Sequence, residues 1–378
     1  MNKIHSLDTF RFMLALLVVW GHSWINLYQK IDNLGYHVEA LAVDGFFILS
    51  GLLLAKSCYS IMQSTLYDAD KEFLNLTTHR FKRLWPEYFF ALLIVLIFHI
   101  IFNKEQFISI IPLNLLLIGQ INKIPSIING TWYVCLLFYV GTFLSALILY
   151  KKKTAIYIIL PAIALISLFY ISSAVGHLVM HGATYGSFEY FPTGWLKAFL
   201  DLSLGILLYY IINNFKKLDL KNKYKNYFFR FIELIGIFFV IFPMTRSYYG
   251  FNDYLVLFGY SAIISVLYLQ QEHLLKFFSY NIFRKISCSA YMLYLTHIII
   301  LETIRDKFNY LIYPRYYIYS FIFLLSVTFS VVCYHTQKWL FSKLKQILFI
   351  PQVENSSLNV ENPERERERE LCQASSEK

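Results

Sequence analysis

Long apolar stretches alternate with short polar ones along most of the chain. The apolar stretches hold about 20 residues each, the length that an α-helix needs to cross the hydrocarbon core of a bilayer. This pattern predicts an all-α, polytopic transmembrane helix bundle. We expect about ten spans, near residues 7–28, 38–58, 84–102, 130–150, 154–173, 193–214, 228–245, 253–270, 286–303 and 316–340.

The polar stretches between these spans differ in their content of Lys and Arg. Basic residues are concentrated in one set of alternate loops, 56–83, 151–153, 214–230 and 271–285, and again beyond Lys338. Cytoplasmic loops carry such an excess, so both termini are predicted to be cytoplasmic. We expect a membrane domain at 1–345 and a polar, disordered cytoplasmic tail at 346–378.

Composition supports a membrane protein and excludes several other classes. Of the 378 residues 57% are hydrophobic and only 15% are charged, while the net charge is +10. We attribute this charge to loop topology and contact with anionic lipid headgroups, and we expect no nucleic-acid partner. The five cysteines form no C-x-x-C pair, so we expect no metal site. We also expect no bound cofactor.

The first span contains two ionisable residues, Arg11 and His22. Eleven residues bring an α-helix back to within about 20° of its starting direction, so both side chains share one face, roughly 16 Å apart. Ionisable groups inside a span usually face the bundle interior and mark a substrate path. Taken alone, Arg11 also fits a cytoplasmic anchor whose guanidinium reaches the headgroups, and His22 also fits an interfacial hydrogen-bonding residue.

Asp44 lies about two turns into the second span, at a depth similar to that of His22. A carboxylate beside an imidazole fixes its tautomer and supports its charge when it accepts a proton. We therefore predict that Asp44 orients His22. A purely structural role for Asp44, bonded to backbone or to a serine, is the alternative.

The cytoplasmic stretch before the third span contains Arg80 and Arg83, which are three residues apart and fall on one helix face. Two guanidinium groups side by side bind phosphate oxygens well, and coenzyme A carries such phosphates. We expect Pro86 to end or turn this short helix. Contact of the basic cluster with lipid headgroups is the alternative, and it is our expectation for Lys82.

Three further residues are candidates for lining a cavity or binding an acceptor. Trp132 and Tyr133 open the fourth span on the predicted outer side, where such residues also form interfacial belts. His297 lies about three turns into the ninth span. It is expected either to line the same cavity as His22 or to be a hydrogen-bonded core residue.

Several of these motifs resemble the acyltransferase-3 family of integral-membrane acyltransferases, which includes O-antigen and exopolysaccharide O-acetyltransferases. They are Arg, ten residues and His in the first span, DGFFILSG at 44–51, Arg-x-x-Arg at 80–83, and SCSAYMLYLTH at 287–297. The resemblance implies transfer of an acyl group, often acetyl, from cytoplasmic acyl-CoA to a hydroxyl of an extracytoplasmic glycan. Many relatives carry Trp-Ser-Leu followed by an acidic residue where this chain has WYVCLL, so a carboxylate is missing at that position.

On this reading His22 is the general base and Asp44 its orienting residue. Arg11 steadies the donor, while Arg80 and Arg83 hold its phosphates. The expected partners are membrane lipids, acyl-CoA and a glycan acceptor, and the expected location is a bacterial cytoplasmic membrane. A transporter or flippase for a lipid-linked glycan is the alternative, although the chain lacks the corresponding Gly- or Pro-interrupted halves expected of a transporter built from repeats.

Overall fold

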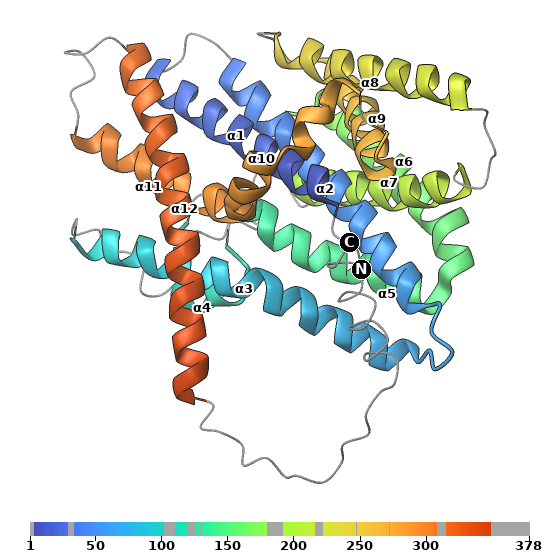
Figure 1. Ribbon diagram of the computed structural model, residues 1–378, viewed down its shortest axis with the longest axis horizontal. Coiled ribbons are helices and arrows are strands. Elements are labelled where there is room, and N and C mark those ends of the chain that lie inside the picture. The colour runs from blue at the N-terminus through green and yellow to red at the C-terminus, as the bar shows by residue number, and fades with distance from the viewer. Residues whose placement is uncertain are drawn as a thin grey trace, which may run out of the picture. The chain divides into compact units, whose positions relative to one another are not determined.

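The computed structural model describes residues 4–28, 34–101, 110–119, 126–128, 130–179, 192–215, 222–246, 248–271, 273–307 and 315–348. These residues form helices and no β-strand (Figure 1), so the prediction of an all-α polytopic bundle is confirmed. The α-helices are α1 (His5–Tyr28), α2 (Leu34–Ile61), α3 (Ala69–Ile101), α4 (Ile111–Leu115), α5 (Trp132–Thr154), α6 (Leu160–Ala174), α7 (Thr193–Phe215), α8 (Asn222–Met244), α9 (Leu255–Leu269), α10 (Asn281–Ile286), α11 (Ala290–Lys307) and α12 (Arg315–Leu348).

Eight helical runs within the described residues are long and apolar enough to cross a membrane, as expected for a multi-pass membrane protein. α1, which carries Asp8, Arg11 and His22, is not among them. The predicted spans at 130–150 and 154–173 form one helical run, Trp132–Ala174, whose backbone leaves helical geometry at Lys151 (φ −138°, ψ 48°). The expected number of ten spans and the cytoplasmic position of both termini stay predictions.

The chain divides into two compact units, Met1–His335 and Thr336–Lys378. The described part of the second unit is the end of α12, up to Leu348. The predicted tail beyond this residue lies outside the described residues, and the domain boundary expected after residue 345 stays a prediction.

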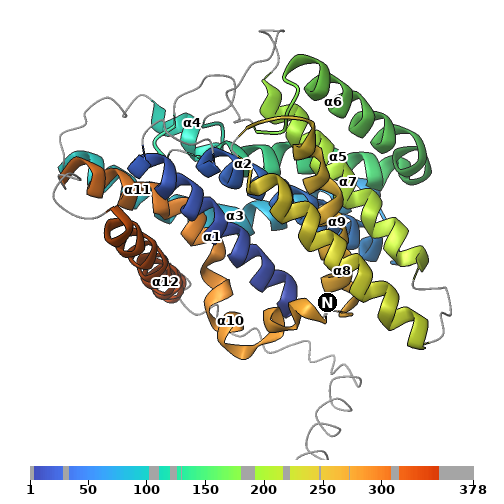
Figure 2. The ribbon, with the colours of Figure 1, turned by 90° about the horizontal axis from the view of Figure 1, so that it is seen from above.

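Helix α2 runs through the middle of the first unit, between α1 and α7 (Figure 2). In its most apolar stretch 89% of the residues are buried, against 22% for α3. Two glycines let α2 and α7 cross closely. A Cβ at Gly51 of α2 would lie 2.2 Å from the carbonyl oxygen of Leu202, and one at Gly205 of α7 would lie 2.0 Å from that of Ile48. Small residues at a crossing allow such an approach in membrane proteins.

Helix α3 differs from its prediction. It is one continuous helix of 33 residues with Pro86 inside it, so the proline does not end a short helix before the span. Arg80 and Arg83 therefore lie within a long helix, about 15 to 20 Å from its first residue. Its neighbour α5 runs beside it, and the two helices are joined near their ends by a hydrogen bond from Tyr150 to Asp70.

Candidate active site

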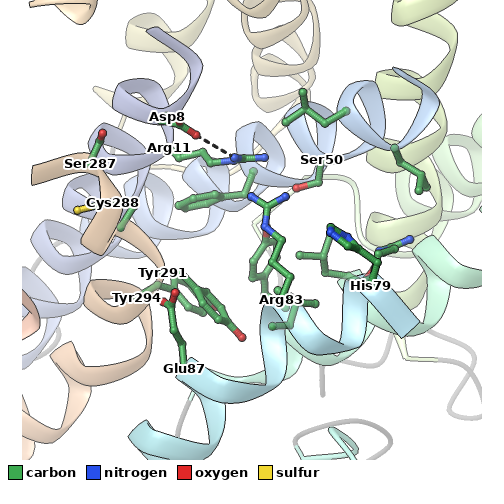
Figure 3. A pocket seen from close by; sticks show the side chains of 18 of the residues that line it. Asp8, Arg11, Ser50, His79, Arg83, Glu87, Ser287, Cys288, Tyr291 and Tyr294 are labelled. Carbon is green, nitrogen blue, oxygen red and sulfur yellow. Dashed lines mark hydrogen bonds and ion pairs between the residues drawn. The ribbon is translucent and has the colours of Figure 1, made fainter. Parts of the chain in front are cut away.

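A cavity of about 340 Å³ lies between α1, α2, α3, α5 and α11 (Figure 3). It falls in the usual size range of small-ligand pockets, about 300 to 1,000 Å³. Its wall holds three arginines that the sequence singled out, Arg11, Arg80 and Arg83. The structure thus brings together two basic motifs that are about 70 residues apart in the chain.

The arginines differ in how they are held. Arg11 pairs with Asp8 one turn earlier in α1, at 3.3 Å. Arg80 donates from Nη2 to the carbonyl oxygen of Leu137 at 2.7 Å, while its buried Nη1 has no hydrogen-bond partner. Arg83 is exposed and extends from α3 into the cavity toward Ser50 (Figure 3).

A glycine makes the position of Arg80 possible. A Cβ at Gly141 of α5 would lie 2.2 Å from Nη2 of Arg80, so the guanidinium packs directly on the α5 backbone. Nη2 is thereby anchored on the α5 backbone, while the buried Nη1 keeps donors that no protein group uses. Lys82 is exposed and does not line the cavity.

Sequence reasoning missed other polar groups of this wall, namely Asp8, His79, Glu87 and Tyr291. The two carboxylates offset part of the positive charge of the three arginines. His79 stands one position before Arg80, and its place in a basic stretch was the only signal available. The cavity is therefore positively charged on balance but is not lined by cations alone.

Aromatic rings close one end of the cavity. Phe46, Tyr133 and Tyr294 contact one another, with ring centroids 5.3 to 6.0 Å apart. Tyr133 is 4% exposed and lines the cavity, while its neighbour Trp132 is 6% exposed and packs on Phe47 instead. Both residues are buried in the bundle, so neither forms the lipid-facing belt that was considered from the sequence.

His22 lies beyond this aromatic end. Tyr294 contacts the ring of His297 at 6.1 Å, and the rings of His297 and His22 are 5.0 Å apart in an edge-to-face arrangement. The two histidines, predicted on separate motifs, are thus neighbours.

The carboxylate beside His22 belongs to Glu39 of α2. Its Oε2 lies 2.8 Å from Nδ1 of His22, which is also 3.1 Å from the carbonyl oxygen of Val18. Both neighbours are acceptors, so Nδ1 carries the proton and Nε2 of the neutral ring holds the lone pair. The side chain of His22 is 27% exposed, against 3% for Glu39.

The predicted pairing of Asp44 with His22 is wrong. Asp44 forms an ion pair with Lys197 of α7, at 2.9 Å. Five residues turn an α-helix by about 140°, so Glu39 and Asp44 point to different sides of α2. Spacing offered a signal for Glu39, because Phe46 and Ser50 of the cavity wall lie on its face, seven and eleven residues later.

His297 shares with His22 a contact between Nδ1 and the carbonyl oxygen four residues earlier, but it is only 1% exposed. Its Nδ1 lies 3.2 Å from the carbonyl oxygen of Leu293, one turn earlier in α11. Its buried Nε2 has no hydrogen-bond partner. The site therefore presents imidazole nitrogens with lone pairs near one end of an arginine-lined cavity, an arrangement suited to binding an anionic ligand and removing a proton from a second one.

Comparisons with known proteins identify the family of the chain. No curated protein and no solved structure matches the chain significantly. The model of the acyltransferase domain (acyltransferase-3) family matches residues 4–335, which include every element of the site. The chain therefore belongs to this family of acyltransferases.

Proposed function

We propose that this membrane acyltransferase moves an acetyl group from cytoplasmic acetyl-CoA to a hydroxyl of a cell-surface carbohydrate. The observation that carries the proposal is the joining of an arginine-lined cavity to the His22–Glu39 pair through Tyr294 and His297. The proposed location is a bacterial cytoplasmic membrane, with donor and acceptor reaching the site from opposite faces.

The arginines are assigned to the donor. Arg83 and the unpaired Nη1 of Arg80 supply hydrogen bonds to phosphate oxygens of coenzyme A. Arg11, held by Asp8, steadies the thioester end. The acyl chain then points toward the aromatic end of the cavity, where Tyr133 and Tyr294 exclude water from the thioester.

His22 is assigned to the acceptor. Its Nε2 takes the hydroxyl proton as the hydroxyl oxygen attacks the thioester carbonyl carbon. The carbon–sulfur bond breaks, and the coenzyme A thiolate leaves and receives the proton that the His22 imidazolium gives up, which returns His22 to its neutral form. Glu39 stabilises the imidazolium that forms, and the unpaired Nε2 of His297 accepts a hydrogen bond that positions the acceptor.

The test is release of free coenzyme A by the purified protein in liposomes supplied with acetyl-CoA, with and without a bacterial glycan extract. We expect acceptor-dependent release that is lost in His22→Gln and kept in the matched control His335→Gln, an exposed histidine. Absence of release, together with movement of a lipid-linked glycan across the same liposomes, would support a flippase instead.

A further inference from the structure

A second ionisable cluster lies on the other side of α2. Asp44, Lys197 and Asp201 are all 0% exposed. Lys197 and Asp201 are four residues apart in α7 and so share one helix face. All three stand apart from the residues that line the arginine cavity, and the proposed acyl transfer uses none of them.

All three N–H donors of the Lys197 ammonium group are engaged in hydrogen bonds. Its Nζ lies 2.9 and 3.1 Å from the two carboxylate oxygens of Asp44. It also donates to the carbonyl oxygens of Ala40, at 3.1 Å, and Leu178, at 2.8 Å. An ammonium group has three N–H donors, and these three acceptor groups occupy them. Lys197 therefore has no donor left for Asp201.

Asp201 is buried without a donor. Neither of its carboxyl oxygens receives a hydrogen bond, yet its carboxyl is within hydrogen-bonding reach of that of Asp44. Two ionised carboxylates repel each other, and neither can donate a hydrogen bond. One proton between them converts this repulsion into a hydrogen bond from a carboxylic acid to a carboxylate, which is among the stronger kinds.

Charge balance favours the same arrangement. Lys197 and Asp44 neutralise each other, so an ionised Asp201 would leave one uncompensated charge in the middle of the bundle. A metal ion beside Asp201 would be repelled by the ammonium of Lys197. A proton on Asp201 leaves the whole cluster neutral.

Other titratable groups surround the cluster without supplying a donor to Asp201. Asp253 acts on Asp44 electrostatically but is itself paired with His37 at 2.9 Å. Tyr260 of α9 interacts electrostatically with Asp44, and its hydroxyl makes no hydrogen bond. His177 lies in the segment that follows α6, where burial lowers its pKa. It is therefore neutral at pH 7.

We propose that Asp44, Lys197 and Asp201 form a proton-binding site inside the bundle, with one proton shared by the two carboxyl groups. The site lies beside the close crossing of α2 and α7, because Asp201 directly precedes Leu202, whose carbonyl oxygen lies against Gly51. Loss of the proton would place a second negative charge at this crossing. The site is independent of which acyl group or acceptor the protein uses.

Infrared spectroscopy of the purified protein tests this directly. At neutral pH the wild type should show the carbonyl stretch of a protonated carboxylic acid, shifted in D₂O. Asp201→Asn should lose this band and still fold, because an amide also donates to Asp44. Asp44→Asn should lose it too, since Asp201 then ionises to pair with Lys197. The control Asp253→Asn should keep it.

Stability measurements supply a second readout. The wild-type unfolding temperature should fall as the pH rises above about 4, the ordinary pKa of an aspartate, because the native state keeps a proton that the unfolded state has lost, and Asp201→Asn should remove this dependence. The double variant D44N/D201N should be strongly destabilised, because Lys197 then lacks any carboxylate, and adding Lys197→Met should restore folding. A wild type without the band, or a band that persists in Asp201→Asn and Asp44→Asn, would overturn the proposal. Stabilisation by sodium ions instead of protons would also overturn it.

Discussion

Glu39 and Asp44 stand five residues apart on the same buried helix, yet their surroundings differ. Glu39 holds an imidazole whose side chain is 27% exposed and which is linked to the cavity wall through His297 and Tyr294. Asp44 holds an ammonium group that is completely enclosed and fully hydrogen-bonded. Only the first of these two pairs has a basic side chain that is partly exposed. On the proposed function, access rather than the presence of buried charge distinguishes the carboxylate that supports catalysis, Glu39, from Asp44.

Among the substitutions considered, replacement of His22 should cause the largest loss of activity. General base catalysis contributes typically about 10²- to 10⁴-fold, so His22→Gln should lower kcat by about this factor. The unfolding temperature should change little, because the side chain is partly exposed. Steady-state rates beside a thermal melt of the same preparation measure both effects. Near-full turnover in this variant would remove His22 from the mechanism.

Glu39→Gln should have the next largest effect. The amide keeps the shape of the side chain but no longer stabilises the imidazolium, and it is also able to donate to Nδ1 and so favour the wrong tautomer. We expect kcat to fall by about 10- to 100-fold, as for other partners that orient a histidine. Single-turnover measurements at saturating acetyl-CoA would isolate this step. An effect confined to KM would contradict the assignment.

Arg83→Ala should weaken donor binding without altering the chemistry at His22. A hydrogen bond to a charged group contributes about 1.5 to 3 kcal/mol, so KM for acetyl-CoA should rise by about tenfold or more. Lys82→Ala is the matched control, since this exposed residue lies outside the cavity wall. Equal losses in the two variants would show that the basic stretch acts through general charge and not through a defined site.

Gly141→Ala should give the smallest effect. The added Cβ would displace the guanidinium of Arg80 while leaving every charge in place. We expect a rise in KM for acetyl-CoA that is smaller than that of Arg83→Ala, with kcat unchanged. Gly250→Ala, where a Cβ would meet nothing within 4 Å, is the control. An unchanged KM in Gly141→Ala would indicate that Arg80 does not contact the donor.

Helical periodicity was enough to find much of the site from the sequence. The eleven-residue spacing of Arg11 and His22 and the three-residue spacing of Arg80 and Arg83 both placed side chains on one helix face. Contacts within one helix follow from such spacing. The structure then brings the three arginines to one cavity wall, which no spacing within a single helix could reveal.

Contacts between helices were harder to predict because they depend on how each helix is rotated. The depth of Asp44 in its span predicted His22 as its partner. Asp44 and Glu39 face directions about 140° apart on α2, however, and it is Glu39 that faces His22. Lys197 stands inside the predicted span 193–214, which signals a buried position, but a single lysine does not reveal which helix it meets. Pro86 was misread because a proline is tolerated inside a membrane helix when neighbours satisfy the freed backbone group.

The most direct test measures kcat and the unfolding temperature of Glu39→Gln and Asp44→Asn in parallel. We expect Glu39→Gln to lose kcat and to keep its unfolding temperature. Asp44→Asn should show a modestly lower unfolding temperature with kcat per folded molecule retained, because Lys197 loses its present partner and pairs with Asp201 instead. The reverse pattern, with catalysis lost in Asp44→Asn and retained in Glu39→Gln, would contradict the assignment of the two carboxylates.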